Sequence, residues 1–152
     1  MTGYSVCNDR EIDMISIEDV RDVFADDKYL VGTGVVIEEA GFEYCKCSLI
    51  ASDDHMNAGG AVQGGAIYTL ADSAFAVASN FRHLSENDGF ITVSQSASIS
   101  YLTAGKNGEK LLAIADKIGG GKRTPVYCID VYGEDDRLVA TMIGNGYSVV
   151  KK

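Results

Sequence analysis

The sequence has little of what marks an unfolded, membrane-spanning or metal-binding chain. It has one proline, and 46% of its residues are apolar, which predicts a folded globular protein. No apolar run approaches the ~18 residues that a membrane helix needs. The two histidines form no cluster with metal-ligand spacing, so we expect no metal site. A chain of 152 residues can build one domain with a proper core but not two comfortable ones.

Basic residues are also scarce, with 13 Lys and Arg against 22 Asp and Glu and a net charge of −9. This excess of acid argues against nucleic acid as a partner, because phosphate contacts need a basic surface. It argues equally against binding to an anionic membrane surface. Any anionic ligand would have to meet a local basic patch.

The cysteines Cys7, Cys45, Cys47 and Cys128 include no C-x-x-C pair. Cys45 and Cys47 are two residues apart in a strand-like run and should point the same way. We interpret the cysteines as reduced core thiols rather than as zinc ligands. The first residues, MTGYSVCNDREIDM, have neither the basic region nor the apolar core of a signal peptide, so we expect a cytoplasmic protein.

Hydrophobic periodicity predicts a short helix, a long helix and about six strands. The short amphipathic helix lies in 16–27, with Ser16 as its N-cap, and the long helix occupies most of Asn57–Asn80. The predicted strands are 32–41, 42–52, 90–102, 109–118, 124–133 and 137–150. Short turns join the last four strands, so we expect them to form an antiparallel meander. The fold class is therefore α+β, with one long helix packed on one antiparallel sheet.

The long helix carries a single acid, Asp72, among apolar and small residues. One stripe should pack on the sheet, namely Ile67, Leu70, Ala71, Ala74, Val77, Ala78 and Phe81. The opposite side holds Gly65, Thr69, Asp72, Ala76 and Ser79. Because small residues allow close approach, we expect a partner subunit or a ligand to cover this side. Asp72 is then a candidate general base or nucleophile, and the alternative is a solvated helix acid.

The start of this helix, Gln63-Gly64-Gly65, is a second candidate for chemistry. Its backbone N–H groups lack intrahelical acceptors and lie at the positive end of the helix dipole. Such an end can polarise a carbonyl oxygen or hold an oxyanion, and glycine lets a substrate come close. The alternative is that the two glycines only make a tight turn into the helix.

The run HMNAGGAVQGGAIYTLADSAFAVASN resembles the core motif of hot-dog-fold acyl-CoA thioesterases of the phenylacetate-pathway type. That motif reads H-x-N, G-x-x-H-G-G and L-A-D-x-A before a long apolar helix. The matching positions are His55, Asn57, Gly60, Gly64, Gly65, Leu70, Ala71, Asp72 and Ala74. The resemblance extends over roughly residues 30 to 150, through the G-K-R-T run and the final strands.

The resemblance implies a single hot-dog domain over 1–152, with an N-terminal helical extension at 1–29. It also implies dimers with active sites at the subunit interface, usually paired into tetramers. Asp72 takes the place of the family's nucleophile or general base. The Gly64 N–H would bind the thioester carbonyl, with Asn57 positioning that carbonyl or the attacking water.

Two further positions follow from the resemblance. Ser94 matches a hydroxyl that holds the water in some relatives, and the alternative is that it belongs only to a hydroxyl-rich sheet surface. It lies on a strand that we expect to place Ile91, Val93, Ala97, Ile99 and Tyr101 on one face and the hydroxyl residues on the other. Gln63 replaces the family's usual histidine; it can hydrogen-bond but cannot change protonation near neutral pH, so we expect a positioning group.

The expected reaction is hydrolysis of an acyl-CoA or aryl-CoA to a free acid and coenzyme A, without a further cofactor. Lys122, Arg123 and Thr124 form a basic patch for the CoA phosphates, or else a hairpin with solvated bases. Tyr68 and Phe75 are candidates to contact the acyl group.

Three other functions are alternatives to thioester hydrolysis. A non-catalytic acyl-CoA-binding hot-dog protein is the alternative that Gln63 keeps open. A hot-dog dehydratase is disfavoured, because His55 and His83 lie outside a fitting motif and are expected to be structural. A serine hydrolase is disfavoured because neither a G-x-S-x-G elbow nor a His-bearing triad is evident.

Overall fold

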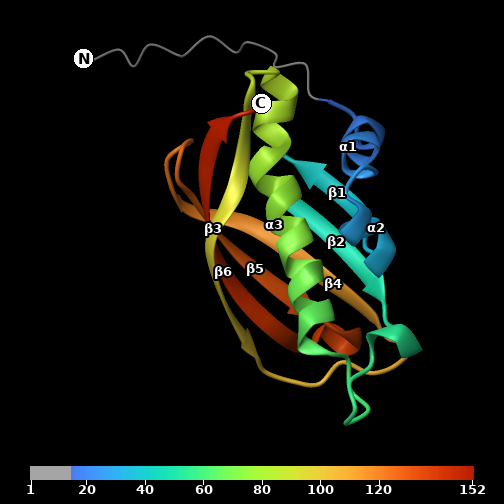
Figure 1. The fold of residues 1–152 in the computed structure, drawn as a ribbon. Coiled ribbons are helices and arrows are strands. Elements are labelled where there is room, and N and C mark those ends of the chain that lie inside the picture. Colours follow the sequence, from blue (N-terminus) through green and yellow to red (C-terminus); the bar gives the residue numbers. More distant parts are fainter. Residues whose placement is uncertain (1–14) are drawn as a thin grey trace, which may run out of the picture.

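The computed structural model describes residues 15–152. Residues 1–14, which include Cys7 and the first part of the predicted extension 1–29, lie outside this range. A six-stranded antiparallel sheet curves around one long helix, α3 (Gly64–Glu86) (Figure 1). The predicted α+β arrangement is confirmed.

The sheet has the strand order β1–β2–β4–β5–β6–β3. The strands are β1 (Val36–Gly41), β2 (Tyr44–Ile50), β3 (Phe90–Tyr101), β4 (Lys110–Gly120), β5 (Pro125–Tyr132) and β6 (Leu138–Val150). The predicted four-strand meander is wrong, because β3 pairs with β6 and not with β4. Both edges of β4 are already occupied, by β2 and β5, so β3 joins the sheet at the free edge of β6.

The long helix is held by its predicted apolar stripe. Its seven residues are all buried: Ile67, Leu70, Ala71, Ala74, Val77, Ala78 and Phe81. Full burial of a large apolar side chain stabilises the fold by roughly 1.5–3 kcal/mol, so this stripe fixes which side of α3 faces the sheet. The helix continues past the predicted Asn80 to Glu86 and ends where Asn87 adopts a left-handed conformation (φ 46°).

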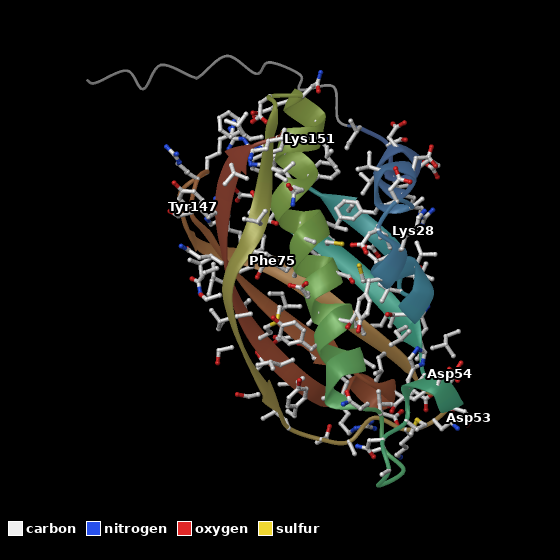
Figure 2. All side chains as sticks on the ribbon, in the orientation of Figure 1. Lys28, Asp53, Asp54, Phe75, Tyr147 and Lys151 are labelled. Atoms are coloured by element: carbon white, nitrogen blue, oxygen red, sulfur yellow. The ribbon has the colours of Figure 1, made fainter. Side chains whose placement is uncertain are left out.

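Phe75 belongs to the same core (Figure 2). Its ring meets that of Tyr127 edge-on, with the ring centroids 5.6 Å apart. Contact between Phe75 and an acyl group is therefore a wrong expectation, since packing leaves only 2% of the residue exposed.

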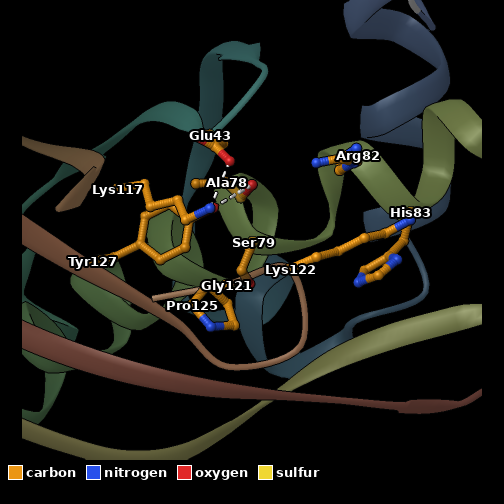
Figure 3. Close-up of a pocket in the computed structure, with 10 residues that line it drawn as sticks. All are labelled: Glu43, Ala78, Ser79, Arg82, His83, Lys117, Gly121, Lys122, Pro125 and Tyr127. Carbon is orange, nitrogen blue, oxygen red and sulfur yellow. Dashed lines mark hydrogen bonds and ion pairs between the residues drawn. The ribbon is translucent and has the colours of Figure 1, made fainter. Parts of the chain in front are cut away.

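The predicted open side of α3 is correct near its start and wrong at Ser79. Thr69, Asp72 and Ala76 are partly exposed, but Ser79 is 6% exposed. The reason is that the β4–β5 hairpin closes over the second half of the helix, where Ser79 shares a small hollow with Gly121 and Pro125 (Figure 3).

A β-bulge in β3 changes which of its side chains point toward the core. The pairing with β6 shifts register between Ser94 and Ser96. Before the bulge Thr92 is buried and Val93 is 41% exposed, whereas after it Ala97 and Ile99 pack on the core. The expected single alternation is therefore wrong at Val93, because one extra residue reverses which side chains face inward.

Two short helices precede the sheet. The predicted first helix is α1 (Ile17–Phe24), and Ser16 closes it with a capping box to Asp19. The second, α2 (Lys28–Thr33), was not expected. The Asp27 side chain caps it by accepting the N–H groups of Tyr29 and Leu30, at 3.1 and 3.0 Å. α2 lies beside α3, and it forms one wall of the site described below (Figure 1).

The interior of β2 holds two free thiols. Cys45 and Cys47 point the same way, as predicted, and their Sγ atoms lie 3.6 Å apart in the core. Across residues 15–152, none of the helices combines the length and the apolar character needed to span a membrane.

Candidate active site

Asp72 opens into a hollow of about 420 Å³ between α2 and α3. Its walls come from Asp27, Tyr29 and Leu30 on one side, from Gly65, Tyr68, Thr69, Ser73 and Ala76 of α3, and from Tyr101 of β3. Asp72 is partly buried, and its carboxylate has no hydrogen-bond or ion-pair partner within residues 15–152. The Asp72 carboxylate thus faces the hollow and makes no hydrogen bond or ion pair within residues 15–152 that would stabilise the fold.

Burial raises the pKa of Asp72, and the negative charge of Asp27 in the same hollow raises it further. A carboxylate with a raised pKa is a stronger base than an ordinary aspartate. Burial also raises the pKa of Tyr68, with a contribution from the Asp72 charge, which places the two groups within electrostatic reach. This environment suits a general base.

Gly64 is the first residue of α3 and lies in an adjoining hollow of about 400 Å³. Its N–H has no acceptor within the described residues, as expected at the first position of a helix. The Tyr101 ring lies against it: a Cβ placed on Gly64 would stand 3.1 Å from a ring carbon. Gly64 therefore offers an open donor at a point where a side chain would crowd the ring.

Gln63 occupies the N-cap of α3, and its side-chain oxygen accepts the N–H of Gly65. This bond satisfies one of the donors that a helix start leaves free. The glutamine found in place of the family's histidine thus has a structural task. It also means that Gly65 is not a free donor, although the residue still lines the Asp72 hollow.

Asn57 lies in the same hollow as Gly64. Its side-chain oxygen accepts the N–H groups of Gly59 and Ala61 at 2.9 and 3.1 Å, so it shapes the loop before the helix. The amide nitrogen makes no hydrogen bond within residues 15–152 and remains available to a ligand.

Gly64 and Asp72 belong to one site only if two chains contribute to it. They are eight residues apart in a continuous helix, which separates them by about 12 Å along its axis. A thioester carbonyl bound at the Gly64 N–H is therefore out of reach of the Asp72 carboxylate of the same chain. Asn57 groups with Gly64, while Tyr68 groups with Asp72.

The remaining predicted residues lie elsewhere. Ser94 is exposed on β3 opposite Gly146, beside the bulge, and lines neither hollow. Lys122 and Arg123 follow β4 in the β4–β5 hairpin, beyond the other end of α3. The Lys122 amine is paired with Glu86 and Asp88, at 2.6 and 3.0 Å.

Arg123 carries the unneutralised charge of this patch. Its guanidinium stacks 5.4 Å from the Tyr147 ring centroid and forms no ion pair within residues 15–152. Thr124 next to it is exposed. The predicted basic patch is therefore present but weaker than its sequence suggests, because two carboxylates already balance Lys122.

The histidines occupy contrasting settings. His55 accepts the N–H of Ser52 at 3.0 Å through Nδ1, so its Nε2 donates to the carbonyl oxygen of Thr33 at 2.8 Å, a structural tie to α2. His83 instead lies between Asp88 and Ser148. Sequence reasoning found no such triad, because Ser148 is on the last strand and no local motif links it to the helix.

Comparison with known proteins bears on the fold and the activity. The thioesterase superfamily profile matches residues 59–140. A protein of Archaeoglobus fulgidus named "Putative esterase" is 33% identical over 134 residues, which is 88% of this chain and 83% of that one. The Escherichia coli acyl-coenzyme A thioesterase PaaI is 28% identical over 119 residues, covering 78% of this chain and 79% of that one.

A solved structure gives the same result for the fold. The E. coli PaaI protein from the phenylacetic acid degradation operon superposes with a TM-score of 0.80 at 24% identity, over 89% of this chain and 94% of that one. The chain belongs to the thioesterase superfamily. Its hot-dog fold is confirmed, and thioester hydrolysis is the general activity that its relatives support.

Proposed function

We propose that this protein hydrolyses acyl-CoA or aryl-CoA thioesters, with Asp72 as the reacting acid. The observation that carries the proposal is the Asp72 carboxylate itself: it is partly buried, has a raised pKa and faces a hollow without a protein partner in the described chain. A structural carboxylate would be hydrogen-bonded or paired. The similarity to PaaI points to a CoA thioester as the substrate class.

The active site takes its two halves from two chains of a homo-oligomer. Gly64 and Asn57 of one chain would bind and orient the thioester carbonyl, and Asp72 of the other would act on it, because about 12 Å of helix separates the two within a chain. The edge of β3 away from β6 is unpaired in the described chain and carries exposed Val93 and Tyr101, which suits pairing with a second copy.

The chemistry needs no cofactor beyond the CoA of the substrate. Asp72 either removes a proton from a water that attacks the carbonyl carbon or attacks that carbon itself. The Gly64 N–H and the dipole of α3 stabilise the oxyanion. In the first route the C–S bond breaks and CoA leaves as the thiol with the proton that Asp72 took from water. In the second route water then hydrolyses the acyl–Asp72 anhydride, which releases the carboxylic acid, frees Asp72 and supplies the proton to CoA. Tyr68 borders the reacting group, and Ser94 remains a candidate to hold the water across the subunit interface.

The phosphates of CoA would bind at Arg123, with Lys122 and Thr124 beside it. Arg123 is favoured because no carboxylate in residues 15–152 neutralises it, while Lys122 would have to exchange Glu86 and Asp88 for phosphate. By analogy with the phenylacetate-pathway thioesterases that the sequence resembles, we also propose a tetrameric assembly, a phenylacetyl-type substrate and a cytoplasmic location.

The direct test is steady-state release of CoA from a panel of acyl- and aryl-CoA substrates. Wild type should turn over at least one of them, and Asp72→Asn should lose about 10³-fold in kcat/KM with an unchanged far-UV spectrum. Asp22→Asn, an exposed acid of α1, is the matched control and should keep full activity. Tight binding of acyl-CoA without turnover by wild type would support the non-catalytic alternative instead.

A further inference from the structure

A buried histidine lies between a carboxylate and a serine at the C-terminal end of α3. His83 Nδ1 is 2.8 Å from Asp88 Oδ2, and its Nε2 is 3.0 Å from Ser148 Oγ. His83 and Ser148 are 5% and 3% exposed. The three residues come from α3, the turn after it and β6, so the fold brings together groups that are 65 positions apart in sequence.

The hydrogen bonds around Asp88 fix which histidine nitrogen is the base. Burial would raise the pKa of Asp88, but hydrogen bonds from His83, Lys122 and the N–H of Phe90 hold it at about 2. The ionised carboxylate can only accept, so Nδ1 carries a proton and donates to it. In the neutral ring the lone pair is then on Nε2, which faces the Ser148 hydroxyl.

Ser148 is held firmly in this position. Its N–H donates to the carbonyl oxygen of Arg123 at 2.8 Å. Its Oγ lies 2.9 Å from Thr92 Oγ1 and 3.1 Å from the carbonyl oxygen of Lys122. The single hydroxyl proton has three acceptors in reach, namely the Lys122 carbonyl oxygen, Thr92 Oγ1 and His83 Nε2, so its donation to His83 competes with the other two.

The serine and histidine border a hollow of about 370 Å³ that is distinct from the Asp72 hollow, although it includes Lys122 and Arg123, the residues proposed above to bind the CoA phosphates. Its other walls are Phe90, Val150, Lys122 and Arg123. None of these residues lines the Asp72 hollow, and His83 follows Asp72 by eleven positions, about 17 Å along α3. Figure 3 shows the Lys122 side chain extending toward His83 from the hairpin.

The chemistry of the walls indicates the ligand. Phe90 and Val150 are 39% and 68% exposed and give the hollow an apolar rim. The Arg123 guanidinium, without an ion-pair partner in the described residues, adds positive charge to the lining of the hollow. A small uncharged ester fits this combination, because its acyl chain meets the apolar rim and the oxyanion that forms meets the arginine.

We propose that Ser148, His83 and Asp88 form a second, Asp72-independent site that hydrolyses small carboxylic esters. Ser148 Oγ bonds to the ester carbonyl carbon while its proton moves to His83 Nε2. The acyl C–O bond then breaks, and Nε2 returns the proton to the leaving alcohol. Water attacks the acyl-serine with Nε2 again taking a proton, which releases the carboxylic acid and restores the Ser148 hydroxyl.

Labelling of the wild-type protein tests the proposal without any substitution. An alkyl fluorophosphonate should form a covalent adduct, and peptide mass spectrometry should place it on Ser148. Ser98, an exposed serine of β3, is the internal control and should stay unmodified. No adduct, or equal modification of Ser98, would overturn the proposal.

A second arm measures turnover in the Asp72→Asn background, where the thioesterase is disabled. Hydrolysis of 4-nitrophenyl acetate should persist there and fall about 100-fold when Ser148→Ala or His83→Gln is added. Each double variant is used only if its melting temperature equals that of the Asp72→Asn single variant. If neither Ser148→Ala nor His83→Gln lowers ester hydrolysis, the proposed second site is wrong. The proposal that Asp72 is the reacting acid of a thioesterase would not be affected.

Discussion

The hydroxyl of Tyr101 donates to the carbonyl oxygen of Gly64 at 3.0 Å, so an aromatic ring from the end of β3 rests on the first turn of α3. Tyr101 borders both the Asp72 hollow and the Gly64 hollow and is 50% exposed. The ring therefore forms a wall shared by the two hollows of one chain.

The role of the Gly64 N–H can be tested by removing that hydrogen alone. Proline is tolerated at the first position of a helix, and Gln63 has the extended backbone (φ −64°, ψ 135°) that a residue before proline prefers. Gly64→Pro should lower kcat/KM about 100-fold because it cannot bind the oxyanion. Gly64→Ala brings a similar contact with Tyr101 but keeps the donor, and should retain most activity.

The kcat/KM values of the two variants are compared once both have been shown to keep the helix content and melting temperature of wild type. If Gly64→Pro and Gly64→Ala lose the same activity, crowding of Tyr101 explains the loss and the N–H is not used.

The activity should depend on pH through Asp72. Since burial and then the Asp27 charge raise its pKa, the acid limb of the kcat/KM profile should lie above the ordinary aspartate value of about 3.9. Asp27→Asn removes the second cause and should move this limb to lower pH. A limb that stays in place in Asp27→Asn would show that the two acids do not interact.

Asp72 should also affect the stability of the fold. The ionised form that would be needed for catalysis should lower the free energy of unfolding. A raised folded-state pKa means that the native state prefers the protonated acid, so stability is greatest below the unfolded pKa and declines as pH rises through the folded one. Asp72→Asn should therefore melt at a higher temperature than wild type at pH 7. The difference should shrink on acidification, and a lower melting temperature at pH 7 would contradict this account.

Gln63 should matter more for the helix than for the chemistry. Gln63→Ala removes the cap on the Gly65 N–H and should cost about 1 kcal/mol in urea unfolding. Gln63→Ser, which can cap in the same way, should restore most of that loss and keep turnover. Full stability in Gln63→Ala would mean that the cap is dispensable, and the role expected from the sequence, positioning of the reacting groups, would then be the one left for Gln63.

Much of the fold followed from periodicity. The apolar stripe of α3 and the six strands could be predicted because each pattern is local and repeats over many residues. The position of β3 could not, since its pairing with β6 depends on which edges β4 has left free. The bulge beside Ser94 was equally hidden, because one extra residue leaves the alternation in the sequence unchanged.

The candidate site was predicted in part, for a related reason. Asp72 stood out because it is a lone acid among small residues, and Gly64 because a helix start leaves donors free. The cap made by Gln63 and the ion pairs of Lys122 were not evident, since both depend on side-chain contacts. The contact of His83 with Ser148 was missed because it joins a helix to the last strand.

The measurement that tests the central claim most directly is complementation between two inactive chains. Asp72→Asn and Gly64→Pro subunits are mixed by co-expression, and thioester hydrolysis is compared with that of either variant alone. If each site takes Asp72 from one chain and Gly64 from the other, mixed dimers hold one intact site, and activity should return to about a quarter of wild type. If no activity returns although mixed oligomers are shown to form, the two-chain site is wrong.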